Sequence, residues 1–121
     1  MFQSAIPVLH VARSADAETF YASLGFTVEF RTRADDALLD PCYVGVVKDG
    51  VRLHLSSFPG DGVSGSAVFI LVDDVDALHQ TFLRGRVPIA MPPTDQTWGN
   101  REMYVRDPDG NALRFVRAGG G

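Results

Sequence analysis

The chain has 121 residues, of which 45% are hydrophobic and 21% charged, and its formal net charge is -4 at pH 7. This length and composition are typical of one globular domain. A negative net charge without runs of Lys or Arg excludes the basic surface that nucleic acid or an anionic membrane binds, and favours a cationic ligand.

No apolar run approaches the ~20 residues that cross a bilayer, so we expect no membrane segment. The N-terminal segment lacks the basic and apolar regions of a secretion signal. Cys42 is the only cysteine, which excludes an intramolecular disulfide and a multi-cysteine metal site. A cytoplasmic protein is therefore predicted.

The first half of the chain is predicted to contain a strand, a helix and three further strands. Ser14 is a candidate helix N-cap, and apolar residues at helical spacing follow it until Gly25 ends the helix. The polar segment 31–41 is predicted as a loop, and Asp49-Gly50 is a dipeptide that favours a two-residue hairpin turn. The strands expected from apolar alternation are residues 5–11, 26–30, 43–47 and 51–57.

Residues 58–65, FPGDGVSG, lack any periodicity and are predicted to be a linker. The same order of elements then recurs. A helix is expected near 74–84, with acidic residues at its start, where they favour the positive helix end, and with Gly85 after it. The strands expected in this half are residues 66–72, 88–91, 101–105 and 112–117.

The two halves also share residues at a spacing of 60 positions. Gly25 and Gly85 are separated by this distance, and the Asp-Gly pairs at 49–50 and 109–110 are too. A repeat of this period predicts an α+β protein built from two βαβββ modules. One helix covers only one face of each sheet, so the other face must be buried by a mate or line a site.

Side-chain alternation indicates which residues lie on that open face. In the last strand of the first module, Leu53 and Leu55 share one face, and His54 lies on the other. In the second module, the turn Asp-Pro-Asp-Gly at 107–110 has type I chemistry and sets the register of the last strand. Arg114 is then the equivalent of His54, on the open face.

The segments FYASLGF at 20–26 and WGNREMYVRDPDGN at 98–111, with the repeated element order, resemble the vicinal oxygen chelate superfamily. This superfamily includes glyoxalase I, extradiol dioxygenases, fosfomycin-resistance enzymes and bleomycin-resistance proteins. The resemblance implies one glyoxalase-like domain over residues 1–121. Its expected parts are module one at about 5–57, the linker 58–65, module two at about 66–117 and the tail 118–121.

In metal-dependent members, the first and last strands of each module supply one metal ligand each. The resemblance places these ligands at Ile6, His54, Ala67 and Arg114. Only His54 can bind a metal, because Ile6 and Ala67 have no donor atom and Arg114 is a permanent cation. We therefore predict no metal, no cofactor and no catalytic residue.

The metal-free bleomycin-resistance branch is the closer resemblance. It implies a homodimer that sequesters a bulky cationic antibiotic in grooves between two chains, without chemical change. By this resemblance Phe30, Tyr43 and Trp98 are the stacking surfaces for planar rings. The polar ligand contacts are then His54, Glu102 and Arg114.

Several alternatives to this interpretation remain open. A metal-dependent glyoxalase-like or dioxygenase-like enzyme would need ligands at unusual positions, such as His10 or Glu102. A small-molecule sensor or carrier would need only the groove. Arginines near the expected groove favour an anionic or neutral ligand over a cationic drug. The aromatic residues Phe30, Tyr43 and Trp98 could instead belong to the core. The sequence does not distinguish these ligands, nor whether a dimer exchanges strands.

Overall fold

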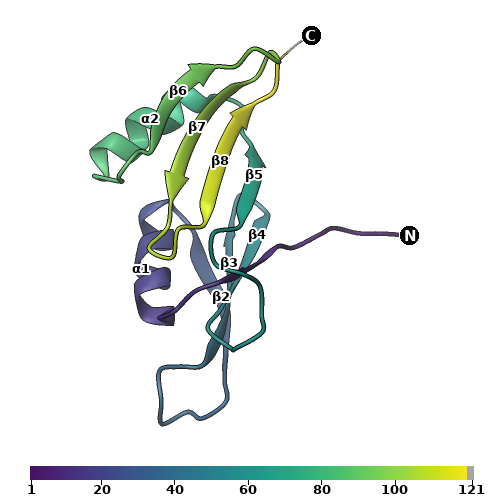
Figure 1. Cartoon of the computed structure of the whole chain (residues 1–121), viewed down its shortest axis with the longest axis vertical. Helices are drawn as coiled ribbons and strands as arrows, with labels where there is room; N and C mark the ends of the chain where they lie inside the picture. Colours follow the sequence, from purple (N-terminus) through teal and green to yellow (C-terminus); the bar gives the residue numbers. More distant parts are fainter. Residues whose placement is uncertain (120–121) are drawn as a thin grey trace. The chain divides into compact units, whose positions relative to one another are not determined.

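The computed structural model describes residues 1–119. The chain divides into two compact units, Met1–Ser64 and Gly65–Gly121. Each unit contains one α-helix and one four-stranded mixed sheet (Figure 1). The predicted α+β class and the two βαβββ modules are confirmed. None of the helices within the described residues is long and apolar enough to cross a membrane.

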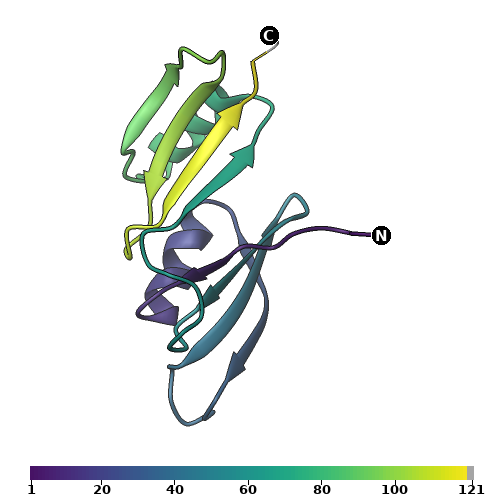
Figure 2. The same cartoon turned by 45° about the vertical axis from the view of Figure 1, so that its right-hand side comes forward.

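The first unit forms a sheet of order β1-β4-β3-β2, in which β1 is parallel to β4 and the other neighbours are antiparallel. Helix α1 packs against one face of this sheet (Figure 2). Buried apolar side chains of β3 and β4, such as Val44 and Leu55, form the core beneath it. The elements are β1 (Val8–His10), α1 (Ser14–Ser23), β2 (Thr27–Arg33), β3 (Cys42–Lys48) and β4 (Val51–Ser56).

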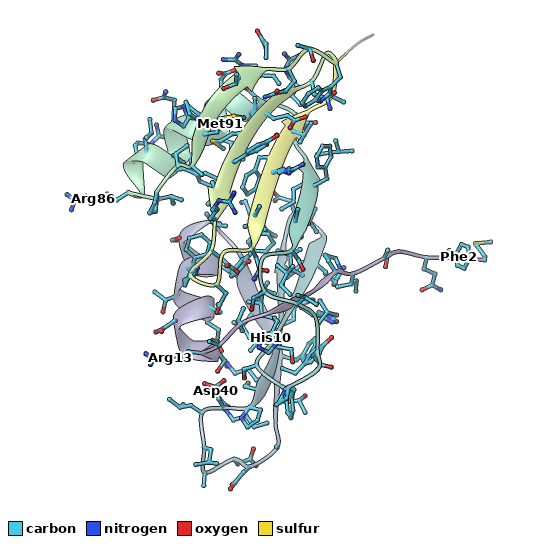
Figure 3. The ribbon with its side chains drawn as sticks, viewed as in Figure 1. Phe2, His10, Arg13, Asp40, Arg86 and Met91 are labelled. Carbon is cyan, nitrogen blue, oxygen red and sulfur yellow. The ribbon has the colours of Figure 1, made fainter. Side chains whose placement is uncertain are left out.

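The hairpin between β3 and β4 has the predicted two-residue turn. Asp49 and Gly50 have φ values of 50° and 77°, as a type I′ turn requires at both central positions. The predicted N-cap was wrong, because Ser14 is already the first helical residue and Arg13 is the cap. The backbone N–H of Ser14 instead donates to Oδ1 of Asp40 at 3.1 Å. Figure 3 shows Asp40 beside the helix start, so a distant loop supplies the capping carboxylate.

The second unit repeats this plan with the sheet order β5-β8-β7-β6 and β5 parallel to β8. Helix α2 begins at the predicted acidic cluster, where the side chain of Asp74 accepts a hydrogen bond from the N–H of Ala77 at 3.0 Å. Phe82 of α2 is buried against Phe115 of β8. The elements are β5 (Ala67–Leu71), α2 (Val75–Arg84), β6 (Met91–Asp95), β7 (Arg101–Arg106) and β8 (Ala112–Arg117).

Two strands have different bounds from those predicted. The strand expected at 88–91 lies instead at Met91–Asp95, where Pro92 and Pro93 made the sequence resemble a loop. Proline lacks an N–H, but β6 is an edge strand and does not need every donor. Similarly, β2 continues to Arg33 and shortens the predicted loop, because its polar residues pair with β3.

The turn before β8 has the predicted type I hydrogen bond, from the N–H of Gly110 to the carbonyl of Asp107 at 3.0 Å. The Asp107 carboxylate also accepts the N–H groups of Asp109 and Asn111 at 2.9 Å each. These bonds fix the residue at which β8 begins. Leu113 and Phe115 are therefore buried, and Arg114 lies on the open face.

Candidate functional site

The strand registers align one open-face residue from each strand into a row across each sheet. In the first unit the row is made by the partner pairs Val8–His54, His54–Gly45 and Gly45–Phe30. In the second unit it is made by the pairs Phe69–Arg114, Arg114–Tyr104 and Tyr104–Met91. We name these the His54 row and the Arg114 row. The repeated modules thus present equivalent rows with different chemistry.

A β-bulge decides that Phe30 belongs to the His54 row. Simple alternation from Val28 would place Phe30 on the helix side of the sheet. The register shifts between these two residues, so that Val28 pairs with Val46 but Phe30 pairs with Gly45. The extra residue, Glu29, reverses the face of everything after it. Phe30 consequently lies on the open face, 41% exposed.

Phe30, Tyr43 and His54 form a contiguous ring cluster. The Phe30 ring is stacked on Tyr43 with a centroid distance of 6.2 Å, and it meets His54 edge-on at 5.3 Å. The Tyr43 hydroxyl and Nδ1 of His54 share a hydrogen bond of 2.7 Å. Gly45 makes this possible, because a Cβ at that position would overlap the Phe30 ring. The cluster is an apolar platform with polar atoms at one end.

The Tyr43 hydroxyl remains protonated over a wide pH range. Burial raises the pKa of Tyr43, and the negative charge of Asp61 raises it further. A neutral phenol both donates and accepts, so the bond to His54 can form with either neutral imidazole tautomer. This end of the platform can therefore present a donor or an acceptor to a ligand.

In the second unit, Glu102 lies at the centre of a hydrogen-bond network on the open face. Its side chain is 0% exposed. Oε2 accepts from Nε1 of Trp98 at 2.9 Å and from Nδ2 of Asn100 at 3.4 Å, and Oε1 accepts from the Tyr104 hydroxyl at 2.7 Å. A buried carboxylate needs such donors to remain charged. Glu102 therefore holds Trp98 and Tyr104 in place.

The charge on Glu102 follows from these contacts. Burial raises the pKa of Glu102, but hydrogen bonds from Tyr104, Trp98 and Asn100 and the positive charge of Arg114 outweigh burial, so its pKa is lowered. The hydrogen bond to Glu102 raises the pKa of Tyr104, with burial in support. At neutral pH the network thus contains one carboxylate and one neutral phenol.

Arg114 lies over Tyr104, with Cζ at 5.0 Å from the ring centroid. Its Nε is buried and has no hydrogen-bond partner within residues 1–119. An unpaired buried donor costs about 1–3 kcal/mol. None of the ion pairs within the described residues involves Arg114, although Arg31, Arg52 and Arg101 each hold a carboxylate.

The six predicted ligand residues fall into two groups, one in each unit. Phe30, Tyr43 and His54 contact one another, and Trp98 contacts Glu102. Arg114 joins the second group through Tyr104. Sequence reasoning missed Gly45 and Tyr104. Tyr104 could have been found from the sequence by pairing its strand in register with the last strand, because it then lies opposite Arg114.

The comparisons with known proteins agree with the fold. A family model described as Glyoxalase superfamily protein matches residues 1–121. The chain belongs to this superfamily. Its predicted resemblance is thereby confirmed, although no curated protein matches the sequence.

Solved structures in the superfamily share the fold. A bleomycin-binding protein from Streptomyces verticillus, complexed with copper(II)-bleomycin, is 29% identical with a TM-score of 0.73, covering 98% of each chain. A superfamily member from Sphaerobacter thermophilus is 26% identical with a TM-score of 0.76, covering 97% of this chain and 98% of that one. A bleomycin resistance determinant encoded on the transposon Tn5 is 21% identical with a TM-score of 0.78, with coverages of 97% and 98%.

The side chains present do not fit a metal of the kind that enzymes of the superfamily carry. His54 pairs with Val8 of β1 rather than with Ile6, and Arg114 pairs with Phe69 of β5 rather than with Ala67. None of these neighbours has a donor atom. Within residues 1–119, no group of three His, Cys, Asp or Glu side chains could hold a metal ion.

The relocated ligands considered from the sequence have other partners. Nδ1 of His10 donates to the carbonyl oxygen of Asp61 at 3.0 Å. Both oxygens of Glu102 accept hydrogen bonds from neutral donors. Among the described residues, neither side chain belongs to a group of three His, Cys, Asp or Glu side chains that could hold a metal ion.

Proposed function

We propose that this protein binds a small organic molecule with planar rings on the open faces of its sheets and does not change it chemically. The observation that carries the proposal is the Phe30, Tyr43 and His54 platform, in which Gly45 leaves room for the Phe30 ring and Phe30 remains partly exposed. Exposed aromatic faces beside a few polar atoms are typical of small-molecule sites. Trp98 offers a second such surface, 63% exposed.

Bleomycin-type antibiotics are the first ligands to test. The Streptomyces verticillus relative binds copper(II)-bleomycin, and the two proteins are similar over almost their full lengths. Sequestration of such a drug would confer resistance without catalysis. Direct ligand contacts are proposed for Phe30, Tyr43, His54, Trp98 and Arg114, whereas buried Glu102 acts by positioning Trp98.

We also propose that the protein is a homodimer in the cytoplasm. Each open face leaves large apolar side chains exposed, including Phe30 in the first unit and Phe69 and Leu71 in the second. Such apolar surfaces favour association. Sedimentation velocity at micromolar concentration should give twice the monomer mass, and a monomer alone would contradict the dimer. The cytoplasmic location rests on the single unpaired Cys42.

Thermal unfolding in the presence of bleomycin tests the function, because a ligand that binds only the native state raises the melting temperature. The wild type and Leu83→Ala, an exposed apolar control on α2, should show the same shift. Phe30→Ala and Trp98→Ala should reduce it. No shift with bleomycin would contradict the drug assignment.

The competing enzyme hypothesis is tested by a separate measurement of metal binding. A divalent metal that binds in a 1:1 ratio, and that is lost in His54→Ala, would contradict a purely non-catalytic role. Equilibrium dialysis against zinc, nickel and manganese, followed by metal analysis, measures this directly. We expect no metal to be retained in that ratio, since His54 belongs to no group of three His, Cys, Asp or Glu side chains within residues 1–119 that could hold an ion.

A further inference from the structure

The Arg114 row carries a cation that makes no ion pair with a carboxylate within residues 1–119, although its charge helps to lower the pKa of Glu102. Arg31, Arg52 and Arg101 each place two nitrogens on a carboxylate. Arg114 makes no such pair within residues 1–119, and its buried Nε has no acceptor there. Solvent alone does not satisfy all hydrogen-bond donors of a half-buried guanidinium. Arg114 therefore has an unsatisfied donor and no carboxylate partner within these residues.

Glu102 does not supply that acceptor, although it lies on the same open face. Its Oε1 is taken by Tyr104, and its Oε2 by Trp98 and Asn100. A carboxylate has about four lone-pair positions, and three of those of Glu102 already accept from neutral donors. No ion pair joins it to the Arg114 guanidinium. Neutral donors thus satisfy the buried anion, and the cation is left available.

The residues beside Arg114 are aromatic. Phe69 is its register partner on β5 and is 53% exposed, and Tyr104 is its partner on β7. Adjacent strands are ~4.8 Å apart, so a ring lying on Phe69 can carry a substituent within reach of the guanidinium. The planar guanidinium matches a carboxylate with two parallel hydrogen bonds.

We propose that the open face of the second sheet binds an aromatic carboxylate, with the carboxylate on Arg114 and the ring on Phe69. This inference rests on the proposed small-molecule function and names the chemical class of the ligand. It also accounts for an arginine at the row position where the other module has a histidine. A cationic group would be repelled from the same point, so Arg114 would contact an anionic or neutral part of a larger ligand.

Isothermal titration calorimetry with 2-naphthoate as the probe tests the inference. On the wild type, 2-naphthoate should bind at least tenfold more tightly than 2-naphthamide or acetate, which lack the charge and the ring respectively. Arg114→Gln should reduce the affinity for 2-naphthoate at least tenfold, and Arg114→Lys by less. The matched control Arg117→Gln, an exposed arginine on the same strand, should change it less than twofold.

Equal binding of the acid and the amide, or an unchanged affinity in Arg114→Gln, would overturn the inference. The ligand comparison uses only the wild type, so it decides the matter even where Arg114→Gln fails to fold. Bleomycin binding without 2-naphthoate binding would overturn the carboxylate site and leave the proposed function standing. Absence of binding by both ligands would contradict both proposals.

Discussion

Replacing Gly45 by alanine should displace the Phe30 ring from the open face. The added methyl group would overlap Cε1 of Phe30 and lie 2.6 Å from its Cδ1. The backbone at Gly45 does not have a positive φ, so alanine fits the strand itself. The ring must therefore move, and the platform with Tyr43 and His54 is lost.

The expected magnitude follows from the contacts that break. Phe30 makes ring contacts with Tyr43 and His54, and each aromatic pair contributes ~0.5–1.5 kcal/mol. Alanine in place of glycine recovers ~0.5–1 kcal/mol of strand preference. The difference is a destabilisation of about 1 kcal/mol.

Urea unfolding followed by far-UV circular dichroism measures this change, and a double-mutant cycle assigns its cause. In a Phe30→Ala background the methyl group meets no ring, so Gly45→Ala should be neutral or stabilising there. An equal destabilisation in both backgrounds would refute the steric explanation. Ring resonances of Phe30 that stay unchanged in Gly45→Ala would refute it as well.

The other predictions concern buried hydrogen-bond networks. The pKa of Glu102 is lowered in the folded protein. The stabilisation of the folded state by the ionised carboxylate is therefore complete above the unfolded pKa of about 4.3 and is lost as the pH falls through the folded pKa. In urea titrations, Glu102→Gln should flatten this part of the curve of unfolding free energy against pH. Asn100→Ala should speed amide hydrogen exchange at Gly119, whose N–H donates to Oδ1 of Asn100 at 3.0 Å; unchanged exchange would contradict this link. Asp40→Ala removes the carboxylate that accepts the Ser14 N–H and should cost ~0.5–2 kcal/mol, measured as a lower urea midpoint; a midpoint equal to wild type would contradict the capping role.

Much of the fold follows from local patterns in the sequence. The Asp-Gly hairpin, the Asp-Pro-Asp-Gly turn and the acidic start of α2 all form as predicted. These features depend on the backbone preferences of adjacent residues, which neighbours in the chain determine. Edge strand β6 was misplaced because its prolines are tolerated only at a sheet edge, and edges are a tertiary property.

Only part of the candidate site could be predicted from local patterns in the sequence. Alternation places His54 and Arg114 on the open faces, since a side-chain period of two operates within one strand. It would have placed Phe30 on the wrong face, because the bulge at Glu29 exists only through pairing with β3. The role of Gly45 has the same origin: it is needed only because Phe30 lies above it.

The sequence by itself determined the repeated βαβββ modules and the faces of residues on regular strands, such as His54 and Arg114, because periodicity and turn chemistry are local. Tertiary structure alone decided which of those residues meet. It gave Glu102 three neutral donors, left Arg114 without a carboxylate and placed Phe69 beside it. Strand register joins residues far apart in the chain, and it is set by packing of the whole sheet.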